Sequence, residues 1–325
     1  MRVSPANSAE AIDSASIQPC SLETTLVLRG LAPQQVDDLL RGHGLRALWR
    51  PGLSLALDNP SAAIASESSP QLEHELADGR VLLSSGRPGS LTVEPQHALA
   101  NTLIPQSLGL LMAQQLARSG VMMVHGAALC IEDTGVLALG ARGSGKSVLS
   151  AAALSAGAGI VSDDWLLVGR AEDGRFRAER LRKFLMLRHG WAADRLIAAL
   201  THLGARITPG RVKTVLDIAH QPEAVRQHFP ASIELDRVWL LQRLRTGRAA
   251  ESTTSSCSQA EALAGVIAAT MPLLFGHDFP VESRALLHSA RALVAGLNPI
   301  RLSTGLDLVD APQPALSRLL ASNLR

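Results

Sequence analysis

Short apolar runs separated by turn residues fill the first part of the chain, from about residue 21 to residue 95. Asp78-Gly79 precedes the run RVLLSS, and the letters GRPG precede the run SLTVEP. Turn signals between such runs are typical of β-strands and predict a small β-rich N-terminal lobe over residues 21–96. A helix is expected early in this lobe, near APQQVDDLLRGHG. The polar residues 1–20 are expected to form a disordered tail.

The apolar period changes to that of a helix over HALANTLIPQSLGLLMAQQLARSG, which ends at Gly120. Two strand-like runs follow, VMMVHGAALCI and GVLALG, and then a glycine-rich loop, the alanine-rich run SVLSAAALSAG and the run GIVSDD. The order strand, glycine loop, helix, strand is that of an α/β nucleotide-binding unit. We therefore predict the fold class α/β, with a P-loop domain over residues 97–325.

The rest of this domain continues the alternation of strands and helices. A hairpin is expected to turn at Asp173-Gly174. Further strands are expected at RVKTVLDI, IELDRVWLLQRL and PIRLS, and helices at GWAADRLIAALTHLG, SQAEALAGVIAATMPLLF and VESRALLHSARALVAGL.

Composition narrows the class of partner. The chain has 325 residues, of which 46% are apolar, so it can bury a large core. A net charge of +2 with both signs interspersed and 3% aromatic residues gives neither a basic stripe nor a stacking platform, so we expect no nucleic-acid partner. Polar residues interrupt the longest apolar stretch, so we expect no membrane span. The scattered cysteines Cys20, Cys130 and Cys257 suit a reducing, cytoplasmic location.

The glycine-rich loop matches the phosphate-binding pattern G-x-x-x-x-G-K-[ST] in full. Glycines let successive backbone N–H groups curve around phosphate oxygens, Lys146 supplies positive charge at the β- and γ-phosphates, and the Ser147 hydroxyl can ligate Mg²⁺. Lysine is otherwise rare, because only three of the 31 basic residues are lysines. The alternative is a glycine turn that caps a helix. The predicted nucleotide-binding residues are Gly140, Ala141, Arg142, Gly143, Ser144, Gly145, Lys146 and Ser147.

Two aspartates close the strand that follows the alanine-rich helix. A strand-end carboxylate beside a phosphate loop commonly holds Mg²⁺, and a second one can accept the proton of an attacking hydroxyl. Asp163 and Asp164 suit these two roles, although a polar strand end is the plain structural interpretation. His125 interrupts an apolar strand just before a glycine, and such a histidine alone is more often a packed residue than a catalytic one.

The order of these three pieces resembles the kinase domain of the HPr serine kinase/phosphorylase family. That family has a histidine-glycine strand, a phosphate loop and an aspartate doublet one short helix later, as in His125-Gly126, Gly140 to Ser147 and Asp163-Asp164. The separations, 21 residues from His125 to Lys146 and 17 from Lys146 to Asp163, are similar as well.

This resemblance implies an ATP-dependent kinase with a fold shared with phosphoenolpyruvate carboxykinases. ATP and Mg²⁺ would be the cofactors, and the acceptor would be a serine hydroxyl of a protein or peptide. Asp164 would be the catalytic base, and Asp163 would ligate Mg²⁺ or orient the base. Lys146 and Ser147 would hold the phosphates and the metal, and His125 would lie near the transferred phosphoryl group.

The chain departs from the bifunctional members of that family. It has neither an RGLGI-like stretch with a metal-binding glutamate nor a later Gly-Arg-Asn signature. The pattern is more similar to HPr-kinase-related proteins of proteobacteria, some of which accompany lasso-peptide biosynthesis and phosphorylate a precursor-peptide serine. Two alternatives stay open at this point, a regulatory switch that slowly hydrolyses nucleotide and a kinase for a small hydroxyl-bearing metabolite.

Two further cations are candidates for substrate binding. Arg211 and Lys213 alternate within the predicted strand RVKTVLDI, so they would share one face. They suit phosphate or an acidic peptide, and a solvated strand edge is an equal alternative. The sequence leaves open the acceptor, phosphorylase activity, the preference for ATP or GTP, the role of the N-terminal lobe and the oligomeric state, a homo-oligomer included.

Overall fold

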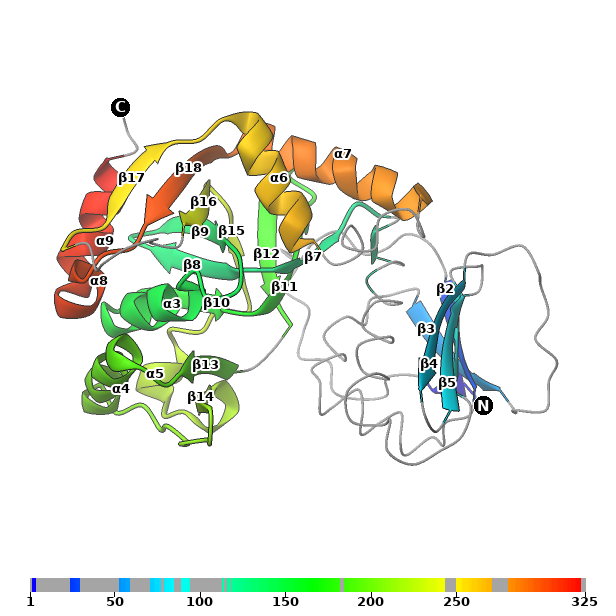
Figure 1. Ribbon diagram of the computed structural model, residues 1–325, viewed down its shortest axis with the longest axis horizontal. Coiled ribbons are helices and arrows are strands. Elements are labelled where there is room, and N and C mark those ends of the chain that lie inside the picture. The colour runs from blue at the N-terminus through cyan, green and yellow to red at the C-terminus, as the bar shows by residue number, and fades with distance from the viewer. Residues whose placement is uncertain are drawn as a thin grey trace. The chain divides into compact units, whose positions relative to one another are not determined.

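The chain packs as two compact units, residues 1–123 with 271–289 and residues 124–270 with 290–325. In this computed structural model (Figure 1) the described residues are 2–3, 24–29, 53–58, 71–76, 79–84, 89–93, 113, 116–117, 119–181, 184–242, 250–270 and 280–322. The helix predicted near APQQVDDLLRGHG lies outside them. The domain boundaries predicted at residues 21 and 97 stay predictions.

The first unit contains a six-stranded sheet in the order β1-β3-β2-β6-β5-β4. Its strands are β1 (Arg2–Val3), β2 (Thr24–Arg29), β3 (Leu53–Asp58), β4 (Gln71–Leu76), β5 (Gly79–Ser84) and β6 (Gly89–Val93). β2 runs parallel to both β3 and β6, whereas β4, β5 and β6 pair antiparallel. β5 and β6 fall in the runs RVLLSS and SLTVEP, where strands were predicted. β1 lies inside the segment that was expected to be a disordered tail and pairs antiparallel with β3.

The second unit is built on a mixed sheet in the order β10-β8-β9-β16-β18-β17. Its strands are β8 (Ala127–Ile131), β9 (Thr134–Leu139), β10 (Gly159–Ser162), β16 (Arg237–Gln242), β17 (Thr253–Ser256) and β18 (Asn298–Ser303). β9, β16 and β18 are parallel, and β8 folds back on β9 through a two-residue turn. Both turn residues, Glu132 and Asp133, have positive φ, as in the tight turns that match strand twist.

Helices cover both faces of this sheet, so the apolar runs of its central strands are buried on each side (Figure 1). The helices of this unit are α3 (Lys146–Ser155), α4 (Trp191–His202), α5 (Glu223–Arg226), α6 (Gln259–Ala269), α8 (Asp307–Asp310) and α9 (Pro312–Ala321), together with residues 290–296 of α7 (Pro280–Gly296). α3 packs against β8, β10 and α9, whereas α6 packs against β9, β16 and β18. The predicted α/β class is confirmed at the level of a mixed sheet flanked by helices. Across the described residues no helix is both long and apolar enough to cross a membrane.

The main core lies between α3, α9 and the inner face of the sheet. Alternate residues of β8 contribute to it, namely Ala127, Leu129 and Ile131. α3 adds Leu149 and a run of buried alanines. Alanine and leucine have the highest helix propensities, so the same residues explain both why this segment is helical and why it packs closely. The helix stops before Gly157, whose φ of +83° is favourable only for glycine.

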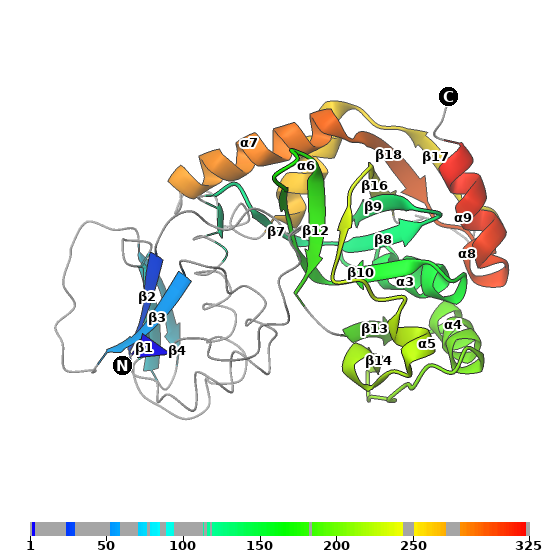
Figure 2. The same cartoon turned by 180° about the vertical axis from the view of Figure 1, so that it is seen from behind.

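Two smaller sheets complete the unit, and Figure 2 shows them from behind. One has the order β15-β12-β11-β7, from β11 (Trp165–Arg170), β12 (Phe176–Arg180), β15 (Ser232–Glu234) and β7 (Met122–His125), of which residues 124–125 belong to this unit. The hairpin predicted at Asp173-Gly174 is confirmed as β11 and β12. The other sheet pairs β13 (Phe184–Arg188) with β14 (Lys213–Asp217), and α4 lies between these strands in the sequence.

The strand predicted over IELDRVWLLQRL is two strands, because the chain turns at Leu235 and Asp236. Asp236 pairs with Gly135 near the start of β9: its carboxylate accepts a hydrogen bond from the Gly135 N–H at 2.7 Å, and its own N–H donates to the Gly135 carbonyl at 2.8 Å. The Leu235 N–H donates to the Phe176 carbonyl at 2.8 Å. β15 therefore joins one sheet and β16 the other, a division that apolar periodicity alone does not reveal.

We expect Gly135→Ala to lower the free energy of unfolding. A Cβ at this position would lie 1.7 Å from the Glu234 carbonyl oxygen, so the backbone would have to move and the bonds to Asp236 would lengthen. Overpacking of this kind costs about 1–3 kcal/mol. The control is Gly296→Ala, where the added Cβ makes only an ordinary contact of 3.8 Å with Phe176. Thermal and urea unfolding of both variants check the prediction, and equal stabilities would contradict it.

Candidate functional site

The glycine-rich loop joins the end of β9 to the start of α3. Gly143 and Gly145 have φ values of +81° and +99°, a left-handed conformation that other residues rarely adopt. At Gly140 a Cβ would lie 2.5 Å from Ser144 Oγ, so the chain folds tightly over itself there. Backbone N–H groups in the first turn of a helix have no partner within the helix, and α3 has no side-chain cap. The loop and the helix start therefore present donors suited to an anion.

Lys146 lies inside this loop rather than on the surface. Its side chain is buried, and Nζ donates to the carbonyl oxygens of Gly140 at 2.6 Å and Ala141 at 3.3 Å. Burial lowers the pKa of Lys146, and the negative charges of Asp164 and Asp163 act in the opposite direction. The ammonium group is thus held across the loop, within electrostatic reach of both aspartates.

Asp163 is the buried member of the doublet. It is 5% exposed, and its Oδ2 accepts a hydrogen bond of 3.4 Å from the backbone N–H of Met186 in β13. Burial raises the pKa of Asp163 to about 7, and Asp164 adds to this rise. The Ser147 hydroxyl, the Met186 N–H and the charge of Lys213 lower it. The carboxylate therefore lies between the helix start and the β13–β14 pair.

Asp164 has a different environment from its neighbour. Its side chain is 18% exposed, and Oδ1 lies 3.4 Å from His125 Nε2. The His125 ring lies 5.2 Å from the Trp165 ring, centroid to centroid, at 41°. The backbone holds this corner as well, because the Gly126 N–H donates to the Asp164 carbonyl at 2.8 Å. The Asp163 carboxylate is enclosed, whereas the Asp164 carboxylate is accessible beside an imidazole. Such a difference in environment allows two neighbouring carboxylates to take different chemical roles.

The two cations proposed from the sequence are not a pair. β14 begins at Lys213, and Arg211 lies in an exposed bend before it, so the expectation that both share one strand face is wrong. The chain folds closely on itself at this bend: a Cβ on Gly210 would lie 2.4 Å from the Lys213 carbonyl oxygen, and the Gly210 carbonyl oxygen lies 2.8 Å from His189 Nε2. Lys213 acts on Asp163 through its charge, whereas Arg211 has no such link to the doublet among the described residues.

Three further residues surround the aspartate doublet and were not among the predicted site residues. Met186 supplies its backbone N–H, Trp165 flanks His125, and the hydroxyl of Ser162 donates to the Trp165 carbonyl at 3.2 Å. The Asp164 N–H lies 3.4 Å from Ser162 Oγ. Ser162 and Trp165 border the doublet in the sequence, which is a usable signal. Met186 is 23 residues from Asp163, and nothing in the sequence links it to the doublet.

The oxygens near the helix start fit a hard divalent cation. Asp163 Oδ1 and Ser144 Oγ are buried without a hydrogen-bond partner among the described residues, and a bound ion or water is one of the partners that complete such atoms. Ser147 and Asp163 offer a hydroxyl and a carboxylate, the ligand types that Mg²⁺ prefers. No group of three or more His, Cys, Asp or Glu side chains suited to a metal occurs in the part of the chain that the structure describes. Mg²⁺ is commonly bound by one or two carboxylates plus substrate phosphates, so Ser147 and Asp163 offer enough protein ligands.

The raised pKa of Asp163 predicts a pH-dependent stability. The folded protein holds this proton up to about pH 7, whereas the unfolded chain releases it near the ordinary value of 3.8. Asp163 therefore stabilises the fold below the unfolded pKa, and this contribution is lost as the pH rises toward 7. We expect Asp163→Asn, which cannot ionise, to gain stability relative to the wild type between pH 4 and about pH 8. Urea unfolding across this range checks it, and a constant difference between the two proteins would contradict it.

Comparison with known proteins adds little to this geometry. No protein-family model matches the chain, and no curated protein matches it. Among solved structures, the Hpr(Ser) kinase/phosphatase from Coxiella burnetii matches with 14% identity over 62% of this chain and 98% of that chain, at a TM-score of 0.30. A TM-score this low carries no conclusion about fold or activity. The assignment of function therefore depends on the residues of the site.

Proposed function

We propose that this protein transfers the γ-phosphoryl group of ATP, with Mg²⁺, to a serine hydroxyl of a protein or peptide. The observation that carries the proposal is the convergence on one helix start of a buried lysine, a buried carboxylate and an accessible carboxylate beside a histidine. Lys146, Asp163 and Asp164 act on one another electrostatically, and Asp164 lies 3.4 Å from His125. These are the groups that phosphoryl transfer requires, namely phosphate binding, metal binding and a base.

The loop Gly140 to Ser147 would bind the phosphates. The N–H groups at the start of α3 would donate to phosphate oxygens, and Lys146 would exchange its bonds to the Gly140 and Ala141 carbonyls for the β- and γ-phosphates. A compact ammonium suits this narrow loop better than the wide fork of an arginine. Positioning and charge neutralisation supply most of the rate in such a reaction.

Ser147 and Asp163 would hold Mg²⁺, which when bound neutralises the developing charge on the phosphates. The raised pKa of Asp163 means that this carboxyl gives up its proton to receive the metal near neutral pH. The Met186 N–H would keep the carboxylate oriented, since it already donates to Oδ2.

Asp164 would act on the acceptor. Its carboxylate would take the proton of the serine hydroxyl as the serine oxygen bonds to the γ-phosphorus, while the bond from that phosphorus to the β,γ-bridging oxygen breaks and ADP leaves. His125 would orient this carboxylate from the side and lie near the transferred group. The products are a phosphoserine and ADP, and the proton stays on Asp164 until it passes to solvent.

The acceptor that we propose first is a precursor peptide of a natural-product pathway. The motif order, and the absence of the signatures of the bifunctional enzymes, are similar to those of the HPr-kinase-related proteins that accompany lasso-peptide biosynthesis. Lys213 lies on the Asp163 side of the site and would meet an acidic segment of such a peptide. A cytoplasmic location is part of the same proposal.

Incubation with γ-labelled ATP and Mg²⁺, alone and with peptides encoded by neighbouring reading frames, tests the proposal. We expect label on a peptide serine, located by mass spectrometry. Release of labelled phosphate without a labelled peptide would instead identify a nucleotide-hydrolysing switch, and label on a small hydroxyl compound would identify a metabolite kinase. Either of these results would contradict transfer to a peptide serine.

A further inference from the structure

The loop after β18 lies against the glycine-rich loop. Thr304 Oγ1 lies 3.6 Å from the place where a Cβ on Gly145 would stand. β18 is parallel to β16, and β16 is parallel to β9, with Ser303 opposite Gln242. The carboxyl ends of three parallel strands thus meet at the edge of the sheet that also carries the glycine-rich loop, although residues 145 and 304 are far apart in the sequence.

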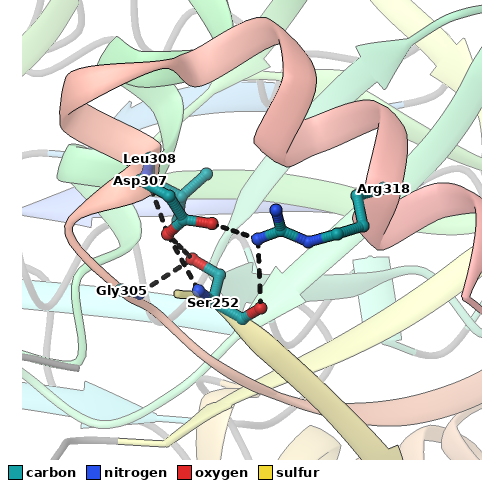
Figure 3. Close-up of polar contacts among 5 residues, drawn as sticks. All are labelled: Ser252, Gly305, Asp307, Leu308 and Arg318. Atoms are coloured by element: carbon teal, nitrogen blue, oxygen red, sulfur yellow. Dashed lines mark hydrogen bonds and ion pairs between the residues drawn. The ribbon is translucent and has the colours of Figure 1, made fainter. Parts of the chain in front are cut away.

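A network of hydrogen bonds fixes this loop (Figure 3). Asp307 Oδ1 accepts from Ser252 N at 2.8 Å, from Ser252 Oγ at 2.7 Å and from Leu308 N at 3.0 Å. Gly305 N donates to Ser252 Oγ at 2.7 Å, and Arg318 pairs with Asp307 Oδ2. Burial acts to raise the pKa of Asp307, but the bonds from Ser252 and Arg318 outweigh it, so the net pKa is lowered and the carboxylate is ionised. We call Ser252, Asp307 and Arg318 the loop clamp.

Thr304 places a polar side chain beside the glycine-rich loop. Gly305 fits only without a side chain, because a Cβ would lie 2.3 Å from the Glu251 carbonyl carbon and 2.5 Å from Ser252 N. Asp307 uses its oxygens on the clamp itself. Thr304 remains half-buried, and its hydroxyl has no hydrogen-bond partner within the described part of the chain. A threonine hydroxyl can donate one hydrogen bond and accept others.

We propose that Thr304 and the loop it belongs to bind the nucleoside end of the nucleotide, the ribose and base, and that the loop clamp holds them in place. This inference depends on the proposed function, since it takes the phosphates to lie on Gly140 to Ser147. In open α/β sheets a ligand lies across the carboxyl ends of the parallel strands. A nucleotide held by its phosphates at the end of β9 extends over the ends of β16 and β18, and at the second of these it meets Thr304.

This role is separable from phosphate binding by the choice of ligand. Inorganic tripolyphosphate has the phosphates of ATP but no ribose or base. Thr304→Val keeps the shape of the side chain and removes the hydroxyl, and Ser252→Ala removes two bonds of the loop clamp. We expect each variant to bind Mg²⁺-ATP about threefold to tenfold more weakly than the wild type, and to bind Mg²⁺-tripolyphosphate with unchanged affinity. The matched control is Thr253→Val, an exposed position on β17 that should change neither affinity.

Isothermal titration of the full-length protein and its variants decides the question, with thermal unfolding to verify that each variant folds. Equal weakening of ATP and tripolyphosphate, or no weakening of either, would overturn the nucleoside role of Thr304 and leave the proposed function standing. Failure of the wild-type protein to bind either ligand would overturn the proposed function and this inference together.

Discussion

Replacement of Asp164 by asparagine should leave ATP binding intact and lower the rate of phosphoryl transfer about 100-fold to 10,000-fold. Asparagine has the shape of aspartate and can still lie beside His125, but it cannot accept the proton of a serine hydroxyl, and general-base catalysis contributes rate factors of this size. The loss should appear in kcat, with little change in the affinity for ATP, because the interaction is made only in the transition state. Transfer of label to the peptide acceptor and titration with ATP measure the two quantities.

The matched control for this variant is Asp194→Asn. Asp194 is an exposed aspartate in the first turn of α4, so its loss of charge should leave transfer unchanged. Asp163→Asn is the informative comparison, since it should weaken the dependence on Mg²⁺ rather than remove the base. Full activity of Asp164→Asn would show that the base lies elsewhere, and Asp163 would then be the first alternative.

Lys146→Ala should abolish stabilisation of the protein by nucleotide. Removal of a buried ammonium from its pairing with phosphate oxygens costs about 2–5 kcal/mol of binding free energy. This cost corresponds to a loss of affinity of about 30-fold or more. Mg²⁺-ATP should raise the unfolding temperature of the wild type and leave that of the variant unchanged at the same concentration. Differential scanning fluorimetry over a series of ATP concentrations gives this result directly.

Two further variants make the result on Lys146 specific. Lys146→Arg keeps the charge, but its planar fork does not fit the place where Nζ lies 2.6 Å from the Gly140 carbonyl, so we expect it to bind ATP poorly as well. Arg206→Ala removes an exposed cation and should leave the nucleotide response unchanged. Normal stabilisation of Lys146→Ala by ATP would contradict the phosphate-binding role of the loop.

Local sequence signals were sufficient for the elements around the glycine-rich loop. Apolar runs, the two left-handed glycines and the alanine-rich stretch are each determined within about ten residues, and they yield β9, the loop, α3 and β10 in the predicted order. The doublet could be placed for the same reason, because a carboxylate directly after a strand must lie at the end of that strand. The fold assignment narrower than a mixed α/β unit, and the roles given to the site residues, stay predictions.

The contacts that complete the site could not be predicted in this way, because they join residues distant in the sequence. Met186 reaches Asp163 across 23 residues, and Ser252 reaches Asp307 across 55. The apolar periodicity of a segment does not predict which hairpin packs against which strand end. The pairing of Arg211 with Lys213 failed because the strand was predicted to begin at Arg211, whereas β14 begins at Lys213 and residues 211 and 212 form a bend.

The most direct test of the account is a crystal structure with Mg²⁺ and a non-hydrolysable ATP analogue. We expect the β- and γ-phosphates to lie on the N–H groups at the start of α3 with Lys146 Nζ on their oxygens. We also expect Ser147 and Asp163 to ligate the metal and Asp164 to face the γ-phosphorus. A nucleotide bound elsewhere, or a bound nucleotide with Asp164 directed away from the terminal phosphate, would contradict it.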